Sequence, residues 1–126
     1  MFQFPQMMKI LVCEDNPMAL KTIRFTLVKA GYEVCQASDG EQAISMLNAD
    51  QFDLVITDIN MPFTKGLELV TYINSHFVQK IPVIIISGIN LKETQDHARE
   101  LGARGYLTKP FDPDQLLELV KTEVPT

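Results

Sequence analysis

Five side chains that could bind a metal ion or take part in a reaction stand at the ends of short apolar runs. They are two carboxylates after the first run, a third at the end of the central run, a hydroxyl and an ammonium group: Glu14, Asp15, Asp58, Ser87 and Lys109. Taken alone, an aspartate after an apolar run is more often a turn-former or a helix cap than a reactive group. A chemical role therefore depends on whether the fold brings these run ends together.

The order of the predicted elements indicates that it does. Strand and helix patterns alternate along the chain, with strands expected at 9–13, 33–37, 54–57, 82–87 and 105–108. This alternation with short connections predicts a single α/β domain, in which a five-stranded parallel sheet carries helices on both faces. The carboxyl ends of parallel strands meet at one edge of the sheet, which is where sites of this architecture lie.

Local signals support the predicted elements. The pairs Asn16-Pro17 and Asp112-Pro113 each combine a capping side chain with a proline at the first helical position. Leu20, Ile23, Leu27 and Ala30 form the expected buried stripe of the first helix, and Gly31 ends that helix. Polar residues within 33–37 place that strand at a sheet edge, because central parallel strands are apolar on both faces.

The sequence also predicts two later helices. We expect one at about 64–75, with Leu67, Val70 and Ile73 facing inward, and one at about 91–101, with Asn90 as its cap. The second of these has a thin apolar stripe, so it is either a solvated surface helix or an element able to move.

Three carboxylates at one sheet edge would repel each other. Two carboxylates about 5 Å apart at an effective dielectric constant near 20 cost roughly 3 kcal/mol. A divalent cation with oxygen ligands relieves this repulsion, and Mg²⁺ is the usual choice where phosphate is the other ligand. The site is therefore predicted to bind Mg²⁺, with Mn²⁺ as a substitute.

Composition excludes several classes of function. With 46% hydrophobic and 21% charged residues in 126, the chain has an ordinary globular composition. A net charge of −5 without a cluster of Lys and Arg argues against a nucleic-acid-binding surface. No run is long and apolar enough to span a membrane, and the first residues do not form a secretory signal. Cys13 and Cys35 are expected to be reduced thiols, which favours a cytoplasmic location.

At these positions the sequence resembles the receiver domain of two-component response regulators, and the resemblance covers residues 9–123. The matching residues are Glu14-Asp15, Asp58, Met61-Pro62, Gly66, Ser87-Gly88, Tyr106 and Lys109-Pro110-Phe111. It implies a doubly wound (βα)5 sandwich with strand order 2-1-3-4-5. It also implies a cis Lys109–Pro110 bond and a domain over 8–124 that follows an extension at 1–7.

The resemblance assigns a role to each residue. It implies that Asp58 accepts a phosphoryl group from a sensor histidine kinase or a histidine phosphotransfer protein. Mg²⁺ would be held by Glu14, Asp15, Asp58 and the backbone carbonyl of Asn60. Lys109 would pair with the phosphoryl group and Ser87 would hydrogen-bond it, while Tyr106 changes rotamer on activation.

The resemblance also implies how the signal leaves the domain. The phosphorylated switch would act on a protein partner or an attached output domain through the face of the fourth helix, fifth strand and fifth helix. Residues 102–105 lack the acidic pair that related DNA-binding regulators use to dimerise through part of this face, which argues against such a dimer. His76 and His97 are expected to be solvated and not phosphodonors.

Other functions remain as alternatives. One is a Mg²⁺-dependent phosphohydrolase with an aspartyl-phosphate intermediate, but such enzymes carry a general acid two residues after the nucleophile. Here that residue is Asn60, which cannot do acid–base work. We therefore expect the chain to phosphorylate and dephosphorylate itself, with no independent substrate. A flavodoxin-like binding module without phosphorylation is also disfavoured, because the acidic turn after the first strand repels phosphate. A receiver-like domain that is not phosphorylated is opposed only by the complete acidic set and Lys109.

Overall fold

The computed structural model describes residues 7–60, 66–77 and 80–124 as five strands and five helices that alternate along the chain. The strands are β1 (Lys9–Cys13), β2 (Glu33–Ala37), β3 (Leu54–Asp58), β4 (Val83–Ser87) and β5 (Gly105–Thr108). The helices are α1 (Pro17–Lys29), α2 (Gly40–Ala49), α3 (Gly66–His76), α4 (Lys92–Leu101) and α5 (Pro113–Glu123). Within these residues no helix has the length and apolarity needed to cross a bilayer.

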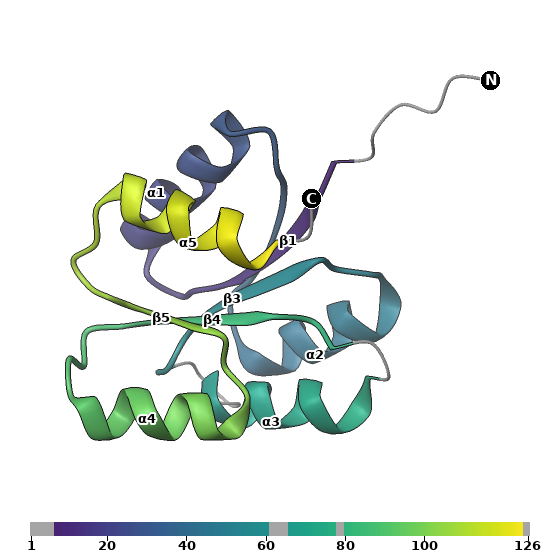
Figure 1. The fold of residues 1–126 in the computed structure, drawn as a ribbon. Coiled ribbons are helices and arrows are strands. Elements are labelled where there is room, and N and C mark those ends of the chain that lie inside the picture. The colour runs from purple at the N-terminus through teal and green to yellow at the C-terminus, as the bar shows by residue number, and fades with distance from the viewer. Residues whose placement is uncertain (1–6, 61–65, 78–79, 125–126) are drawn as a thin grey trace.

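The strands form one parallel sheet in the order β2-β1-β3-β4-β5, as predicted. Helices α1 and α5 cover one face, and α2, α3 and α4 cover the other (Figure 1). Strand order reverses between β1 and β3, because β2 lies on one side of β1 and the later strands lie on the other. The carboxyl ends of β1 and β3 are therefore neighbours at the point where such sheets hold their sites.

Two apolar cores hold the sheet between its helices. One packs α2, α3 and α4 against one face of the sheet, and the other packs α1 and α5 against the opposite face. The central strands contribute to both cores, and every residue of β4 is buried. These strands therefore form a rigid support for the residues at their carboxyl ends.

The predicted caps of α1 and α5 are confirmed. The side chain of Asn16 accepts hydrogen bonds from the backbone N–H groups of Met18 and Ala19, and Asp112 forms a capping box with Gln115. The edge position of β2 and the role of Gly31, which has a positive φ of 98°, are also confirmed.

Several finer predictions were wrong. Leu91 takes the N-cap position of α4 without a capping side chain, and the Asn90 side chain accepts instead from Gln95 at 3.1 Å. Ala30 is exposed, and Thr26 is buried in the stripe of α1 because its hydroxyl is satisfied by the carbonyl of Thr22. In α3 the predicted inward residues Leu67, Val70 and Ile73 do pack against the core, but the prediction missed Leu69, which is fully buried. The predicted start of this helix at residues 64 and 65 lies outside the described residues.

The two cysteines differ in accessibility, and both are free thiols. Cys13 is fully buried at the end of β1, and burial raises the pKa of its thiol to about 12. Cys35 lies on the edge strand β2 and is half-buried.

We predict that the two thiols react at different rates. In native protein at mildly alkaline pH, a thiol reagent should modify Cys35 first, and Cys13 only when the chain unfolds, because the thiolate is the reactive form. Peptide mass spectrometry after timed labelling measures both rates, with Cys35→Ser isolating Cys13. Equal rates for the two cysteines in native protein would contradict the burial of Cys13.

Candidate functional site

Three carboxylates converge at the carboxyl edge of the sheet. Glu14 and Asp15 follow β1, Asp58 ends the neighbouring strand β3, and one oxygen from each of the three lies within 4.8 Å of the others. Glu14 is only 2% exposed, Asp58 is half-buried and Asp15 faces solvent. The sheet thus forces together charges that would separate in an open chain.

Lys109 enters this cluster from the segment that follows β5. Its ammonium group donates to Asp58 Oδ2 at 2.7 Å and to Glu14 Oε1 at 2.5 Å. The Lys109 N–H donates to the carbonyl of Ser87 at 2.7 Å, and the Lys109–Pro110 bond is cis, as expected from the resemblance. One cation therefore bridges two of the three carboxylates.

The electrostatic balance differs between the two bridged carboxylates. Burial raises the pKa of Glu14 to about 7, and the hydrogen bond from Lys109 only partly offsets this effect. Burial acts in the same direction on Asp58, but the hydrogen bonds from the Lys109 ammonium and the Asn60 N–H, together with the charge of Lys109, outweigh it, so the pKa of Asp58 is lowered. Burial would lower the pKa of Lys109, but the two carboxylates raise it above its ordinary value. The pKa values of these two neighbouring carboxyl groups are therefore shifted in opposite directions.

The residues present fit a divalent cation. Within the described residues, Glu14 Oε2 is the one buried side-chain polar atom that has no hydrogen-bond partner. An unpaired buried carboxylate oxygen costs free energy unless a proton or a cation satisfies it. Three carboxylates with one oxygen left unpaired form the hard-oxygen donor set that Mg²⁺ prefers.

Backbone contacts fix the position of Asp58. The N–H of Asn60 donates to Asp58 Oδ1 at 3.0 Å, and the hydroxyl of Thr57 donates to the Asp58 carbonyl at 3.0 Å. Both carboxylate oxygens of Asp58 therefore accept a hydrogen bond, one from the backbone and one from Lys109. Each of these oxygens keeps a second lone pair that can accept from or bind a further group.

Ser87 and Tyr106 are connected through the backbone of Ile89. The Ser87 hydroxyl accepts from the Ile89 N–H at 3.0 Å, and the Tyr106 hydroxyl donates to the Ile89 carbonyl at 2.7 Å. Ser87 is buried, while Tyr106 is half-buried. The sequence pointed to both side chains but gave no sign of this connection, because it runs through main-chain atoms.

Gly66 is required by a close backbone approach. A Cβ added at Gly66 would lie 2.2 Å from the backbone oxygen of Asp58, and the Gly66 N–H donates to the Ile59 carbonyl at 2.9 Å. The glycine in the motif thus lets the start of α3 pack against the end of β3. Met61-Pro62, the other part of that motif, lies outside the described residues.

The remaining residues singled out from the sequence lie apart from the site. His76 and His97 are exposed, as predicted, and His76 stacks on Tyr72 with ring centroids 4.0 Å apart.

Comparisons with known proteins agree with this geometry. A family model for the response regulator receiver domain matches residues 10–121. The transcriptional regulatory protein CrdR of Helicobacter pylori is 35% identical over 113 residues, which cover 90% of this chain and 53% of that protein. The chain spans about half the length of this relative and of the probable transcriptional regulator ycf29 of Pyropia yezoensis.

Solved structures give the same result. The chemotaxis protein CheY4 of Vibrio cholerae superposes with a TM-score of 0.86 at 31% identity, over 94% of this chain and all of that one. The receiver domain of sensor histidine kinase PA1611 of Pseudomonas aeruginosa has a TM-score of 0.84 at 25% identity, over 94% of this chain and 98% of that one. That structure carries a magnesium ion coordinated in its active-site cleft.

The chain therefore belongs to the response regulator receiver domain family of two-component signal transduction. Its sheet is the CheY-like, flavodoxin-like fold with strand order 2-1-3-4-5. Receiver domains are signalling switches that bind Mg²⁺ at an acidic site and interact with histidine kinases or phosphotransfer proteins.

We predict that Gly66→Ala destabilises the protein and distorts its acidic site. The added methyl group must displace the Asp58 backbone, which should cost about 1–3 kcal/mol in the free energy of unfolding. Urea denaturation measures this cost, and Gly88→Ala is a matched control because a Cβ there meets no atom within 4 Å. If both variants lose the same stability, the close approach at Gly66 is not the cause.

Proposed function

We propose that Asp58 accepts a phosphoryl group from a sensor histidine kinase or a histidine phosphotransfer protein. The observation that carries this proposal is the placement of Asp58 between the Lys109 ammonium and two further carboxylates. Its lowered pKa keeps the carboxylate ionised at neutral pH, so it has a lone pair to offer an electrophilic phosphorus atom.

Glu14, Asp15, Asp58 and the backbone carbonyl of Asn60 would hold Mg²⁺, for which Mn²⁺ can substitute. The bound ion supplies positive charge that neutralises the phosphoryl oxygens. The unpaired Oε2 atom of Glu14 and the mutual repulsion of the three carboxylates support this assignment.

The chain's own residues then perform the transfer. An Asp58 carboxylate oxygen forms the new P–O bond while the P–N bond to the donor histidine breaks, and the electron pair stays on the imidazole nitrogen. Lys109 already lies 2.7 Å from Asp58 Oδ2, so its charge is in place for the oxygens of the transferred group. Most of the rate gain comes from this positioning and charge neutralisation.

The connection through Ile89 offers a route from phosphorylation to the surface. A phosphoryl group adds about −1.5 to −2 charge and three acceptor oxygens. If the Ser87 side chain rotates to donate its hydroxyl to one of these oxygens, the hydroxyl moves away from the Ile89 N–H that it now accepts from. The segment that holds Ile89 then moves, and the Tyr106 hydroxyl loses its acceptor. Ser87 and Tyr106 are thus the switch residues of this proposal.

Output would use the face formed by α4, β5 and α5. Of the ten residues in α4 only Ala98 is buried, so this helix can shift without exposing a large apolar surface. We place the receiver domain at residues 8–124, after an extension at 1–7, and in the cytoplasm, where the free thiols would stay reduced. Its target would be a protein partner or an attached output domain.

This function also accounts for Asn60. An aspartyl-phosphate phosphohydrolase would need a general acid at this position, and an amide cannot supply a proton. The proposed role is therefore a switch that phosphorylates itself from a donor and later hydrolyses its own acyl phosphate, with no independent substrate.

We predict that acetyl phosphate with Mg²⁺ adds one phosphoryl group to the native protein, as read by intact mass. Asp58→Ala should show no gain, because the acceptor oxygen is missing. Asp96→Asn, which removes an exposed carboxylate on α4, should behave as native. No gain in the native protein, or an unchanged gain in Asp58→Ala, would refute the proposal.

We also predict that Mg²⁺ raises the melting temperature of the unphosphorylated protein, because a ligand of the folded state stabilises that state. Asp15→Asn should remove most of this increase, since it deletes one ligand without disturbing the buried core. The control Asp96→Asn should keep it. An equal Mg²⁺-dependent increase in both variants would place the ion elsewhere.

A further inference from the structure

Thr57 places a buried hydroxyl directly before Asp58 in β3. Its side chain is fully buried, and the residues that precede it in the strand, Leu54, Val55 and Ile56, are apolar and buried as well. A buried hydroxyl costs free energy unless it is hydrogen-bonded. Because valine has nearly the same shape without the hydroxyl, packing alone would favour valine at this position. The hydroxyl therefore needs a specific partner.

The partner is the backbone carbonyl of Asp58, to which the Thr57 hydroxyl donates at 3.0 Å. The register pairs between β1 and β3 end at Cys13 and Thr57, one residue before Asp58, so the ladder with β1 does not hold this carbonyl. Cys13, which lies directly across from Thr57, offers only a thiol, and a thiol is a weak donor and a weak acceptor. The Asp58 carbonyl is therefore the strong partner of the Thr57 hydroxyl.

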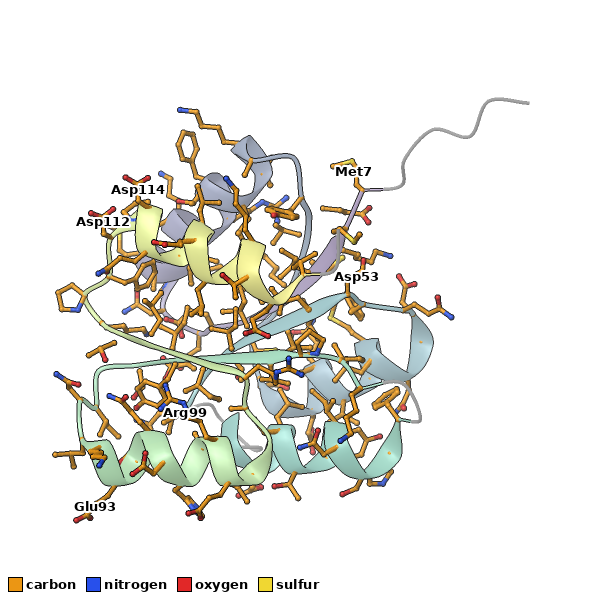
Figure 2. The ribbon with its side chains drawn as sticks, viewed as in Figure 1. Met7, Asp53, Glu93, Arg99, Asp112 and Asp114 are labelled. Atoms are coloured by element: carbon orange, nitrogen blue, oxygen red, sulfur yellow. The ribbon has the colours of Figure 1, made fainter. Side chains whose placement is uncertain are left out.

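The start of α3 encloses the same carbonyl. Side chains fill the layer between the sheet and helices α2, α3 and α4 (Figure 2). Gly66 approaches the end of β3 so closely that a Cβ there would lie 2.2 Å from the Asp58 carbonyl oxygen. The Gly66 N–H donates to the Ile59 carbonyl at 2.9 Å. Thr57 and Gly66 therefore both fix the peptide unit that joins Asp58 to Ile59.

The orientation of this peptide unit sets the course of the chain from Asp58 to Asn60. The Asn60 N–H donates to Asp58 Oδ1 at 3.0 Å, and the Asn60 carbonyl is a proposed ligand of Mg²⁺. A rotation of the peptide unit would move both Asn60 groups relative to the Asp58 carboxylate. Metal sites lose affinity when a residue that orients their ligands is removed. The hydroxyl of Thr57 is therefore placed to affect the metal site without contacting it.

We propose that Thr57 is a positioning residue of the phosphorylation site. Its hydroxyl holds the Asp58 carbonyl in the orientation that places Asn60 beside the Asp58 carboxylate, and it thereby sets the affinity of the site for Mg²⁺. Thr57 acts through the backbone of Asp58 and Asn60, and not by contact with the ion or the phosphoryl group. The link to phosphorylation rests on the proposed function, whereas the effect on Mg²⁺ binding requires only the acidic site.

Two substitutions separate the hydroxyl of Thr57 from its packing. Thr57→Val keeps the shape and loses the hydroxyl, while Thr57→Ser keeps the hydroxyl and loses a methyl group. An NMR titration of the unphosphorylated protein with Mg²⁺ should show about tenfold weaker binding in Thr57→Val, at the low end of the effect of residues that orient metal ligands. Thr57→Ser should bind Mg²⁺ nearly as the native protein does, although the void left by the methyl group lowers its melting temperature.

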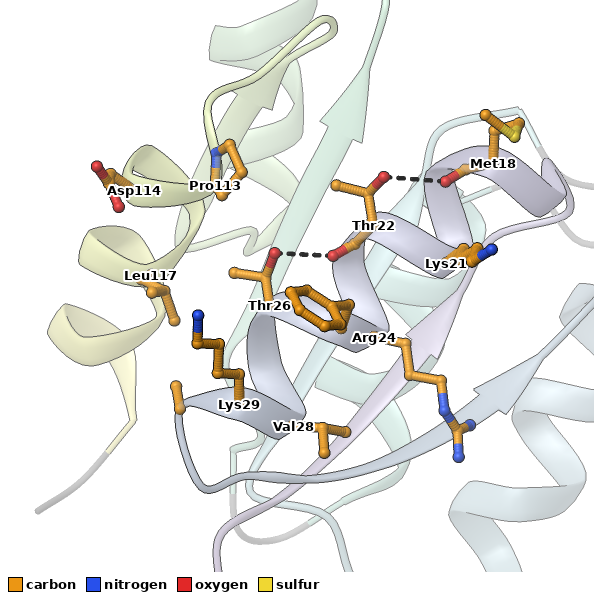
Figure 3. Close-up of a pocket in the computed structure, with 12 residues that line it drawn as sticks. Met18, Lys21, Thr22, Arg24, Thr26, Val28, Lys29, Pro113, Asp114 and Leu117 are labelled. Atoms are coloured by element: carbon orange, nitrogen blue, oxygen red, sulfur yellow. Dashed lines mark hydrogen bonds between the residues drawn. The ribbon is translucent and has the colours of Figure 1, made fainter.

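Thr26→Val is the matched control. Thr26 lines the groove between α1 and α5, is also buried, and donates its hydroxyl to the Thr22 carbonyl at 2.8 Å (Figure 3). Its substitution removes a buried hydrogen bond from a helix that contributes no residue to the acidic site, so Mg²⁺ binding should not change. The proposal is overturned if Thr57→Val binds Mg²⁺ as the native protein does, or if Thr57→Ser or Thr26→Val loses as much affinity as Thr57→Val.

Phosphorylation by acetyl phosphate extends the test to the reaction. At a Mg²⁺ concentration below the native dissociation constant, Thr57→Val should gain its phosphoryl group more slowly, by about the factor that its Mg²⁺ binding is weakened, while Thr57→Ser should keep most of the native rate. All rates are measured well below the melting temperatures, so loss of folded protein does not contribute. If the rates followed stability instead, with Thr57→Ser the slowest, Thr57 would have a purely structural role. A native protein that takes up no phosphoryl group would refute the proposed function and leave the Mg²⁺ titration to decide the role of Thr57.

Discussion

The bridge from Lys109 to Glu14 and Asp58 is the interaction on which the site depends. It joins the segment after β5 to the ends of β1 and β3, and it keeps two carboxylates together that would otherwise repel. It also leaves Glu14 Oε2 unpaired, so the charge balance is incomplete without a proton or a cation. Charge added at Asp58 would therefore change the hydrogen bonds of Lys109 and Glu14, and a phosphorylated switch requires such a change.

The fold separates a rigid part from a part that can move. The central strands are buried on both faces and hold the acidic residues in register. Helix α4 is only thinly buried, and its end is tied to α3 by a hydrogen bond from Asn74 to the Leu101 carbonyl at 2.6 Å. Its beginning follows Ile89, which both Ser87 and Tyr106 contact. Motion would therefore be greatest near the start of α4.

The two faces of the sheet differ in their relation to the switch residues. The face with α4 lies next to the switch residues, so its shape can depend on phosphorylation. The face with α1 and α5 carries a groove whose apolar and charged residues do not take part in the proposed switch.

The sequence by itself determined the alternation of elements, the edge position of β2 and the set of residues at the strand ends. These follow from local rules, because apolar runs, caps and glycines act over a few residues. Tertiary structure alone decided the bridge by Lys109, the orphaned oxygen of Glu14, the connection through Ile89 and the close packing at Gly66. Asn90 shows the limit of local rules, since a suitable cap was replaced by a side-chain contact with Gln95. Such features depend on distances between residues far apart in the chain or on main-chain atoms, neither of which a residue pattern encodes.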